Sequence, residues 1–345
     1  MTGGVGVTHD VEGVRVAGML GRFTYMEDQQ HKIAKPTTLA NTLRQDSSRR
    51  RLGALTLSAL AVAPGRALAE GSRDVSVTSV DPARETALPW VPRYPSDRLA
   101  EEVVSVLRGR DGLVSIAAVH LLDGTGVALN ADDVVPPASL FKLNILAETY
   151  RQIERNRVKL AQMITILPED AAPGAGILQD RIGEAVSVRE ALSLMIGISD
   201  NTAAFALLRT ISSRKLNECT RALGMLRTWF YVDERPDETS AGDVVTILRA
   251  IIDGTIASPR RTDQMLELMT QVQSSAWIRS GLPPGTRLAH KSGQLEGIRN
   301  DAGIVFGPTG QYALAVLTHD LYDPAVGEQI ITAVTRVVHR YFTRD

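Results

Sequence analysis

A serine and a lysine lie one helical turn apart in the stretch Ser139-Leu140-Phe141-Lys142. A serine hydroxyl is a weak nucleophile near neutral pH and needs a base held beside it. Because residues three apart on a helix share a face, we expect Lys142 within hydrogen-bonding reach of Ser139. The apolar neighbours would desolvate the ammonium group and lower the pKa of Lys142, so that its neutral amine can take the serine proton. The pair predicts an activated nucleophile.

Two further motifs follow the first one in the chain. Ser199-Asp200-Asn201 comes next, and Lys291-Ser292-Gly293 lies nearer the C-terminus. A serine and a lysine at this spacing also occur by chance, as Ser212-Ser213-Arg214-Lys215 shows. Alone, Ser139 would be interpreted as a helix-capping serine, with Lys142 extending along an apolar surface. The three motifs in this order favour catalysis instead.

The ordered motifs resemble the signature of class A β-lactamases and penicillin-binding serine hydrolases, over roughly Pro95 to the C-terminus. The resemblance implies an acyl-serine intermediate, with Ser139 as the nucleophile and Lys142 as its base. It implies that Ser199 relays a proton to the leaving nitrogen. Lys291 would stabilise the Ser199 alkoxide or hold the substrate carboxylate.

The same resemblance implies a set of substrate-binding residues: Asn201, Ser292, Gly293, Gln294 and Arg299. Asn201 would bind the substrate amide, and the backbone N–H groups of Ser139 and Gln294 would form the oxyanion hole. Arg299 is either a second anchor for the substrate carboxylate or part of a surface salt bridge. Asp200 is expected to be buried and to hold its loop.

One family motif is missing. Class A enzymes carry E-x-x-L-N between the second and third motifs, and its glutamate activates the deacylating water. No such motif occurs between residues 201 and 291, and the corresponding segment, Thr228–Ala241, is short and offers Glu234 and Glu238 as possible bases. We therefore expect acylation with slow deacylation.

Three functions remain open on this basis. The chain is a divergent β-lactamase, a cell-wall D-Ala peptidase or esterase of the same fold, or a non-catalytic penicillin-binding module. The complete set of serine, lysine and asparagine residues argues against the last, because a binding module does not need a nucleophile with its base.

Composition sets limits on partners and cofactors. The chain has 345 residues, 44% of them hydrophobic and 22% charged, which is ordinary for a globular protein. A net charge of −1 argues against nucleic acid as a partner. Cys219 is the only cysteine, which excludes an intrachain disulfide and a cysteine-based metal site. We expect no metal or cofactor, a small β-lactam or cell-wall peptide as the substrate, and a monomer.

The N-terminal region has the pattern of an export signal. Ser48-Arg49-Arg50-Arg51 precedes the apolar run Leu52–Ala63, and Ala67-Leu68-Ala69 resembles a cleavage site. The apolar run is too short to span a membrane. We expect residues 1–69 to be removed on export to the periplasm or the medium, by the twin-arginine or the general secretory route. The alternative is a cytosolic protein with a basic N-terminus.

Strand patterns occur near both ends of the remaining chain and helical patterns in its middle. The expected strands are Leu113–Leu122, Gly124–Asn130, Arg287–Leu295, Ala302–Phe306 and Ala313–His319. The expected helices are one beginning near Ser96, Leu140–Ile153, Ala191–Ile198, Thr202–Ile211, Asp243–Ile252, Met265–Val272, and a last one over Ile330–Tyr341.

The simplest arrangement closes the early and late strands into one antiparallel sheet. This predicts an α+β fold, a three-layer α/β/α sandwich with an inserted all-α lobe, and the resemblance places the site between the lobes. Residues 70–94 are expected to be a linker and 95–345 the catalytic domain. Its α/β lobe would comprise 95–135 and 260–345, and its helical lobe 136–259.

Overall fold

The computed structural model describes residues 92–231, 235–273 and 277–344. The expected leader, residues 70–91 of the expected linker, and Glu234 lie outside these ranges. No helix in the described ranges is long and apolar enough to cross a membrane.

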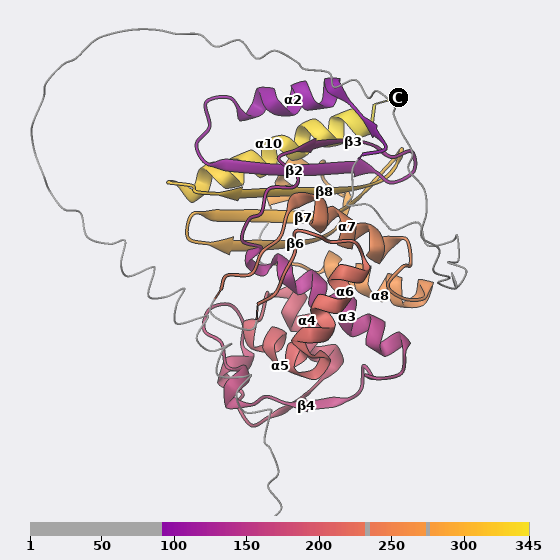
Figure 1. Cartoon of the computed structure of the whole chain (residues 1–345), viewed down its shortest axis with the longest axis vertical. Helices are drawn as coiled ribbons and strands as arrows, with labels where there is room; N and C mark the ends of the chain where they lie inside the picture. Colours follow the sequence, from indigo (N-terminus) through magenta and orange to yellow (C-terminus); the bar gives the residue numbers. More distant parts are fainter. Residues whose placement is uncertain (1–91, 232–234, 274–276, 345) are drawn as a thin grey trace, which may run out of the picture. The chain divides into compact units, whose positions relative to one another are not determined.

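A six-stranded sheet forms the centre of the fold (Figure 1), with the strand order β1-β3-β2-β8-β7-β6. Its strands are β1 (Tyr94–Pro95), β2 (Leu113–His120), β3 (Thr125–Leu129), β6 (Arg287–Leu295), β7 (Ile298–Gly307) and β8 (Gly310–His319). Neighbouring strands are antiparallel, except that β1 runs parallel to β3. Because β2 pairs with β8, the early and late parts of the chain share one sheet, as the sequence predicts.

Helices cover both faces of the sheet and make it the middle of three layers. One face carries α2 (Asp97–Leu107), α9 (Trp277–Gly281) and α10 (Pro324–Phe342), and the other faces α7 (Ala241–Ile252) and α8 (Pro259–Thr270). Side chains of strand β8 pack against the helices on both faces of the sheet. Leu314 and Val316 belong to the core under α10, and Ala313 and Ala315 belong to the core on the opposite face. This alternation confirms the expected α/β/α arrangement.

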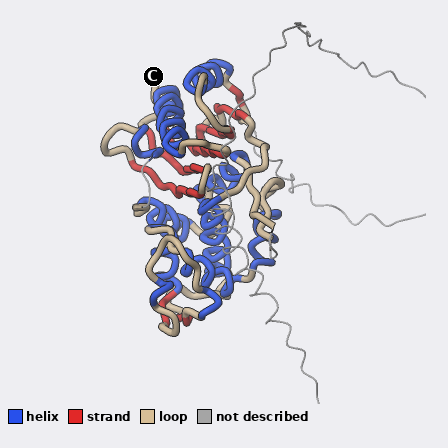
Figure 2. The backbone as a smooth tube through the Cα atoms, turned by 90° about the vertical axis from the view of Figure 1, so that its left-hand side faces the viewer, coloured by secondary structure: helices blue, strands red, loops and turns tan. Residues whose placement is uncertain are grey.

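The inserted helical part follows β3 and lies beside the second face of the sheet (Figure 2). Its elements are η1 (Ala138–Leu140), α3 (Phe141–Glu154), β4 (Met163–Thr165), η2 (Pro168–Asp170), η3 (Leu178–Asp180), β5 (Ala185–Ser187), α4 (Val188–Gly197), α5 (Asn201–Ile211) and α6 (Ser213–Ala222). Side-chain caps set the starts of two helices, since Ser187 accepts from the Glu190 N–H and Asp200 from the Ala203 N–H.

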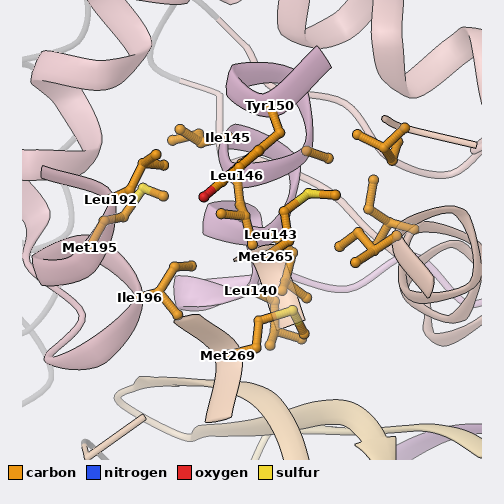
Figure 3. Packing of buried hydrophobic residues seen from close by; sticks show 14 of the residues in the cluster. Leu140, Leu143, Ile145, Leu146, Tyr150, Leu192, Met195, Ile196, Met265 and Met269 are labelled. Carbon is orange, nitrogen blue, oxygen red and sulfur yellow. The ribbon is translucent and has the colours of Figure 1, made fainter. Parts of the chain in front are cut away.

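Helix α3 forms the centre of the helical core. Leu143 and Leu146 pack against Leu192 of α4 and Met265 of α8 (Figure 3), and all four side chains are buried. Dense packing of this kind fixes side chains in single rotamers. The helix that follows Ser139 is therefore a rigid support for the residues it carries.

Several features differ from the sequence-based expectation, three of them for identifiable reasons. Strand β7 begins at Ile298 rather than at residue 302, because the polar residues Asn300 and Asp301 are buried in the strand and satisfied by hydrogen bonds. Helix α6 is an additional helix, and its pattern is weak because only a few of its residues are apolar. Ser139 does not open α3 but lies in the 3-10 turn η1 that precedes it.

Candidate active site

The turn η1 presents Ser139 beside the edge of the sheet. Ala138 has a left-handed backbone, with φ of 46°, which is uncommon for a residue with a side chain. The Asn300 side chain of β7 donates from Nδ2 to the carbonyl oxygens of Pro136 and Pro137, at 3.0 and 3.3 Å. The sheet therefore holds the segment that carries the nucleophile.

Lys142 lies behind Ser139 and is fully buried. Its Nζ is 3.3 Å from the Ser139 Oγ and 3.0 Å from the Ser199 Oγ. It also donates to the Ser199 carbonyl oxygen at 2.6 Å and to Asn201 Oδ1 at 2.8 Å. All four partners are uncharged oxygens. The amine thus connects the first two sequence motifs, and among the described residues no carboxylate contacts it.

This environment favours the neutral amine of Lys142. Burial lowers its pKa well below the ordinary value, and the charge of Lys291 lowers it further, while Asp200 opposes both effects. A buried ammonium group without a carboxylate in contact is costly. Lys142 can therefore take a proton from Ser139, which is the role expected of a general base.

Lys291 approaches the same centre from β6. Its side chain is fully buried, and its Nζ lies 3.1 Å from the Ser199 Oγ and 2.7 Å from the Ser292 carbonyl oxygen. Burial lowers the pKa of Lys291 to about 8, against an opposing effect of Asp301. The Ser199 hydroxyl consequently lies between two lysine amines, in a position to pass a proton.

The loop before α5 is held in a strained conformation. Ser199 has a φ of 62°, a left-handed value that costs free energy in a residue with a side chain. The fully buried Asp200 accepts from the backbone N–H groups of Ile177 at 2.7 Å, Leu178 at 3.0 Å and Ala203 at 2.8 Å. These bonds offset the strain, and Asp200 holds the loop as the sequence indicates.

The segment Pro173–Leu178 completes the surroundings of this loop, and sequence reasoning missed it. The Asn201 Nδ2 donates to the Pro173 carbonyl oxygen at 2.8 Å. Gly176 has a φ of 123°, and a Cβ there would lie 2.3 Å from the Asp200 Cγ. The glycines of this segment were the available signal, because close backbone approach requires them.

Glycine is also required where β6 passes the nucleophile. A Cβ on Gly293 would lie 2.7 Å from the Ser139 backbone nitrogen and 3.0 Å from the Ala138 Cβ. The exposed Gln294 follows Gly293 on this edge strand. Its N–H is the second oxyanion donor that the resemblance implies, beside that of Ser139.

The guanidinium group of Arg299 forms hydrogen bonds and an ion pair with other residues of the chain. Its Nε lies 3.2 Å from Glu328 Oε1, and its Nη1 donates to the carbonyl oxygens of Leu295 and Ile298 at 2.9 and 2.8 Å. Its guanidinium also lies over the Trp277 ring, 5.7 Å from the centroid. The structure shows a partly buried salt bridge between β7 and α10, with hydrogen bonds from the same guanidinium to the β6–β7 turn, and a role as a carboxylate anchor stays a prediction.

Of the two candidate deacylation bases, the structure describes Glu238. Its Oε2 accepts from the Tyr231 hydroxyl at 2.9 Å, and its backbone pairs with Trp229. Within the described ranges, no carboxylate hydrogen-bonds to Ser139 or Lys142. Glu238 is thus engaged within its own loop.

The remaining sequence features lie away from this centre. Lys215, part of the chance second motif, pairs with Glu218 on the surface at 2.7 Å. Nowhere in the described part of the chain do three or more histidine, cysteine or acidic residues gather as they would around a metal ion.

The geometry thus unites Ser139, Lys142, Ser199, Asn201 and Lys291 around one point, and comparison with known proteins agrees. The sequence pattern of the beta-lactamase enzyme family matches residues 98–342. The chain belongs to this family. A beta-lactamase of Streptomyces cellulosae is 28% identical over 61% of this chain and 74% of its own length. Beta-lactamase AST-1 of Nocardia asteroides is 27% identical over 85% of this chain and 95% of its own length.

Solved structures of known proteins share the fold. The structure of PBP-A has a TM-score of 0.69 and 28% identity, covering 73% of this chain and 98% of PBP-A. The beta-lactamase of Sphaerobacter thermophilus DSM 20745 has a TM-score of 0.66 and 26% identity, covering 71% and 96%. The family and α+β fold predicted from the sequence are confirmed, and the family supports a serine β-lactamase-like function.

Proposed function

We propose that the chain hydrolyses β-lactams through an acyl-enzyme formed on Ser139. The observation that carries the proposal is the position of Lys142, whose buried amine reaches both the Ser139 and the Ser199 hydroxyl groups and contacts uncharged oxygens only. A neutral amine in this place satisfies the geometric and the pKa requirement for a general base.

The acylation step follows from these contacts. The Lys142 amine takes the Ser139 proton as the Oγ attacks the lactam carbonyl carbon. The carbonyl oxygen becomes an oxyanion stabilised by backbone N–H donors, and the carbon–nitrogen bond then breaks. Ser199 gives its proton to the departing nitrogen and regains one from the protonated Lys142, 3.0 Å away. No proton is gained or lost overall.

A relative supports acylation by a penicillin. A mutant of PBP-A was solved as an acyl-enzyme complex with penicillin G. It is 29% identical to this chain, covers 73% of it and has a TM-score of 0.69. We carry acylation by penicillins over to Ser139 on this basis.

Deacylation is proposed to be the slow step. Hydrolysis of the acyl-serine needs an activated water, and the described residues provide no carboxylate in contact with Ser139 or Lys142. The engagement of Glu238 with Tyr231 favours a second candidate with the same first step, a hydrolase of D-Ala peptides or esters that β-lactams block. The turnover rate after acylation separates the two.

Intact-protein mass spectrometry tests the proposal. Incubation with penicillin G should add the mass of one penicillin to the wild-type chain and none to Ser139→Ala. Ser212→Ala removes the serine of the chance motif and should be labelled like the wild type. An adduct that survives in Ser139→Ala, or a wild type that shows neither an adduct nor hydrolysis with any β-lactam, would contradict an acyl-enzyme on Ser139.

We also propose that the protein is exported and loses residues 1–69. The support is the order of basic residues, apolar run and Ala67-Leu68-Ala69. N-terminal sequencing of exported protein should begin at Glu70. The double substitution Arg49→Lys and Arg50→Lys should block export if the route is twin-arginine, and unchanged export would indicate the general secretory route. An uncleaved intracellular protein would contradict export.

A further inference from the structure

A buried pair of side chains lies behind the strand that carries Lys291. The His290 Nδ1 is 2.9 Å from Asp301 Oδ1, and both side chains are buried. The other carboxylate oxygen of Asp301 accepts the backbone N–H of Ile278 in α9, at 3.0 Å. Because an ionised carboxylate only accepts, Nδ1 is the donor. Two N–H donors hold Asp301 in one orientation.

The pair and Lys291 occupy opposite faces of the β6–β7 hairpin. Side chains alternate along a strand, and Lys291 reaches Ser199 on the helical side, while its neighbour His290 bonds to Asp301 on the α9 side. Asp301 is paired across the hairpin with Ser292, the residue next to Lys291. The Asp301 carboxylate therefore lies one residue position along the hairpin from Lys291, on the opposite face of the same sheet.

Other charged groups around Lys291 do not replace Asp301. From the helical part come Lys142, which carries no negative charge and whose own pKa is lowered by Lys291, and Asp200, which is bound by three backbone N–H groups and acts on Lys142. Helix α8 packs on β6 with an uncharged face. The buried residues of that face are Thr262, Met265, Leu266 and Met269. Asp301 is the carboxylate that counters the effect of burial on the pKa of Lys291.

We propose that Asp301, held by His290 and by α9, is a positioning residue that keeps Lys291 an ammonium ion for binding the substrate carboxylate. The inference rests on the proposed function. Two buried lysines flank Ser199, and the reaction needs them in different states, one neutral as a base and one charged as an anchor. Separating the charge states of neighbouring groups requires unequal surroundings. Lys142 has only uncharged contacts, and Lys291 has a carboxylate behind it.

The isosteric substitution Asp301→Asn tests this role. The acylation rate should be measured between pH 6 and 9.5, with penicillin G and with its methyl ester, which lacks the carboxylate. For the wild type, the ratio of the acid rate to the ester rate should fall as the pH rises through about 8. In Asp301→Asn this fall should move to lower pH by about one unit, the low end of the effect of one opposite charge. At pH 8 the ratio should then be several-fold below that of the wild type.

Asp170→Asn is a matched control. Asp170 is also buried and accepts from Arg209 and from the Leu167 N–H, but it lies in η2. It should lower thermal stability and leave the pH profile in place. His290→Ala removes one donor from Asp301 and should move the profile in the same direction by less. If Asp301→Asn does not fold, the pH profile of His290→Ala tests the role of Asp301 in its place.

The outcomes separate the two proposals. A wild-type protein that is neither labelled by a β-lactam nor hydrolyses one contradicts the proposed function. The role of Asp301 is overturned if the wild type is acylated but the pH profile of Asp301→Asn is unchanged. Where Asp301→Asn does not fold, an unchanged pH profile in His290→Ala overturns it. An equal shift in Asp170→Asn also overturns it, because any buried carboxylate would then have the same effect.

Discussion

The edge strand β6 touches the nucleophile directly, because Gly293 lies so near Ser139 that a Cβ on the glycine would be 2.7 Å from the serine nitrogen. Real Cβ atoms do not come this close to backbone, so a side chain at this position must displace either the strand or the turn. Both carry the donors expected to hold the oxyanion. The position of the acyl oxygen therefore depends on the absence of one methyl group.

Gly293→Ala should slow the acylation of Ser139 by about 10²-fold or more, the usual cost of losing one oxyanion donor. Stopped-flow measurement with a chromogenic cephalosporin checks this. Gly197→Ala is the control, since a Cβ there meets only the Gln271 carbonyl oxygen at an ordinary 3.7 Å. A rate for Gly293→Ala within a factor of about three of the wild type would show that the contact has no catalytic consequence.

Lys142→Arg should lower the acylation rate by about 10²-fold or more, because arginine keeps a positive charge and cannot act as a base near neutral pH. The measurement is the rate at which the penicillin adduct appears by mass spectrometry. Lys215→Arg, in the chance motif, should leave this rate unchanged. Retention of the wild-type rate in Lys142→Arg would mean that another group takes the Ser139 proton.

Lys291→Met should raise thermal stability at neutral pH. The pKa of Lys291 is lowered from 10.5 to about 8 in the folded chain. Below pH 8 the lysine is charged in both states, and burying the charge costs stability. Between pH 8 and 10.5 the unfolded chain binds more protons, so the wild type gains stability as the pH rises.

The difference in Tm between Lys291→Met and the wild type should therefore be largest below pH 8 and shrink toward pH 10.5. Differential scanning calorimetry at a series of pH values measures it. Lys215→Met, at a surface position, should show no such trend. A difference that stays constant with pH would contradict a lowered pKa for Lys291.

A chromogenic cephalosporin should give a burst near one equivalent, followed by slow turnover. The reason is that no carboxylate of the described residues contacts Ser139, since general base catalysis is worth about 10² to 10⁴ in rate. Glu238→Gln and Glu234→Gln should both leave the burst intact, and at most one should slow the steady phase. Rapid turnover without a burst, abolished by one of these changes, would mean that a carboxylate does activate the water.

The parts of the fold that could be predicted have a clear hydrophobic periodicity or contain a recognisable motif. The predicted strand Arg287–Leu295 coincides with β6, and the predicted helix Leu140–Ile153 agrees with α3 within a residue. The three motifs lead to Ser139, Lys142 and Lys291, since their chemistry requires those residue types. Their convergence on Ser199 then follows from the fold.

The unpredicted parts are irregular or polar. The segment Pro173–Leu178 has no period, and its backbone groups are satisfied by Asp200 and Asn201, far along the chain. The prediction shortens β7 because Asn300 and Asp301 look like turn residues until their buried partners are known. A single sequence does not reveal such distant partners.

The pairing of β2 with β8 also has a consequence for the timing of synthesis. Strand β2 leaves the ribosome long before its partner β8, and the strand that carries Lys291 and Gly293 also comes late. Non-local pairings of this kind form late and slowly. A nascent chain already contains Ser139 and Lys142 on their turn and helix, but not the edge against which an acyl group would be held. We therefore expect that Ser139 is not acylated until the last strands are in place.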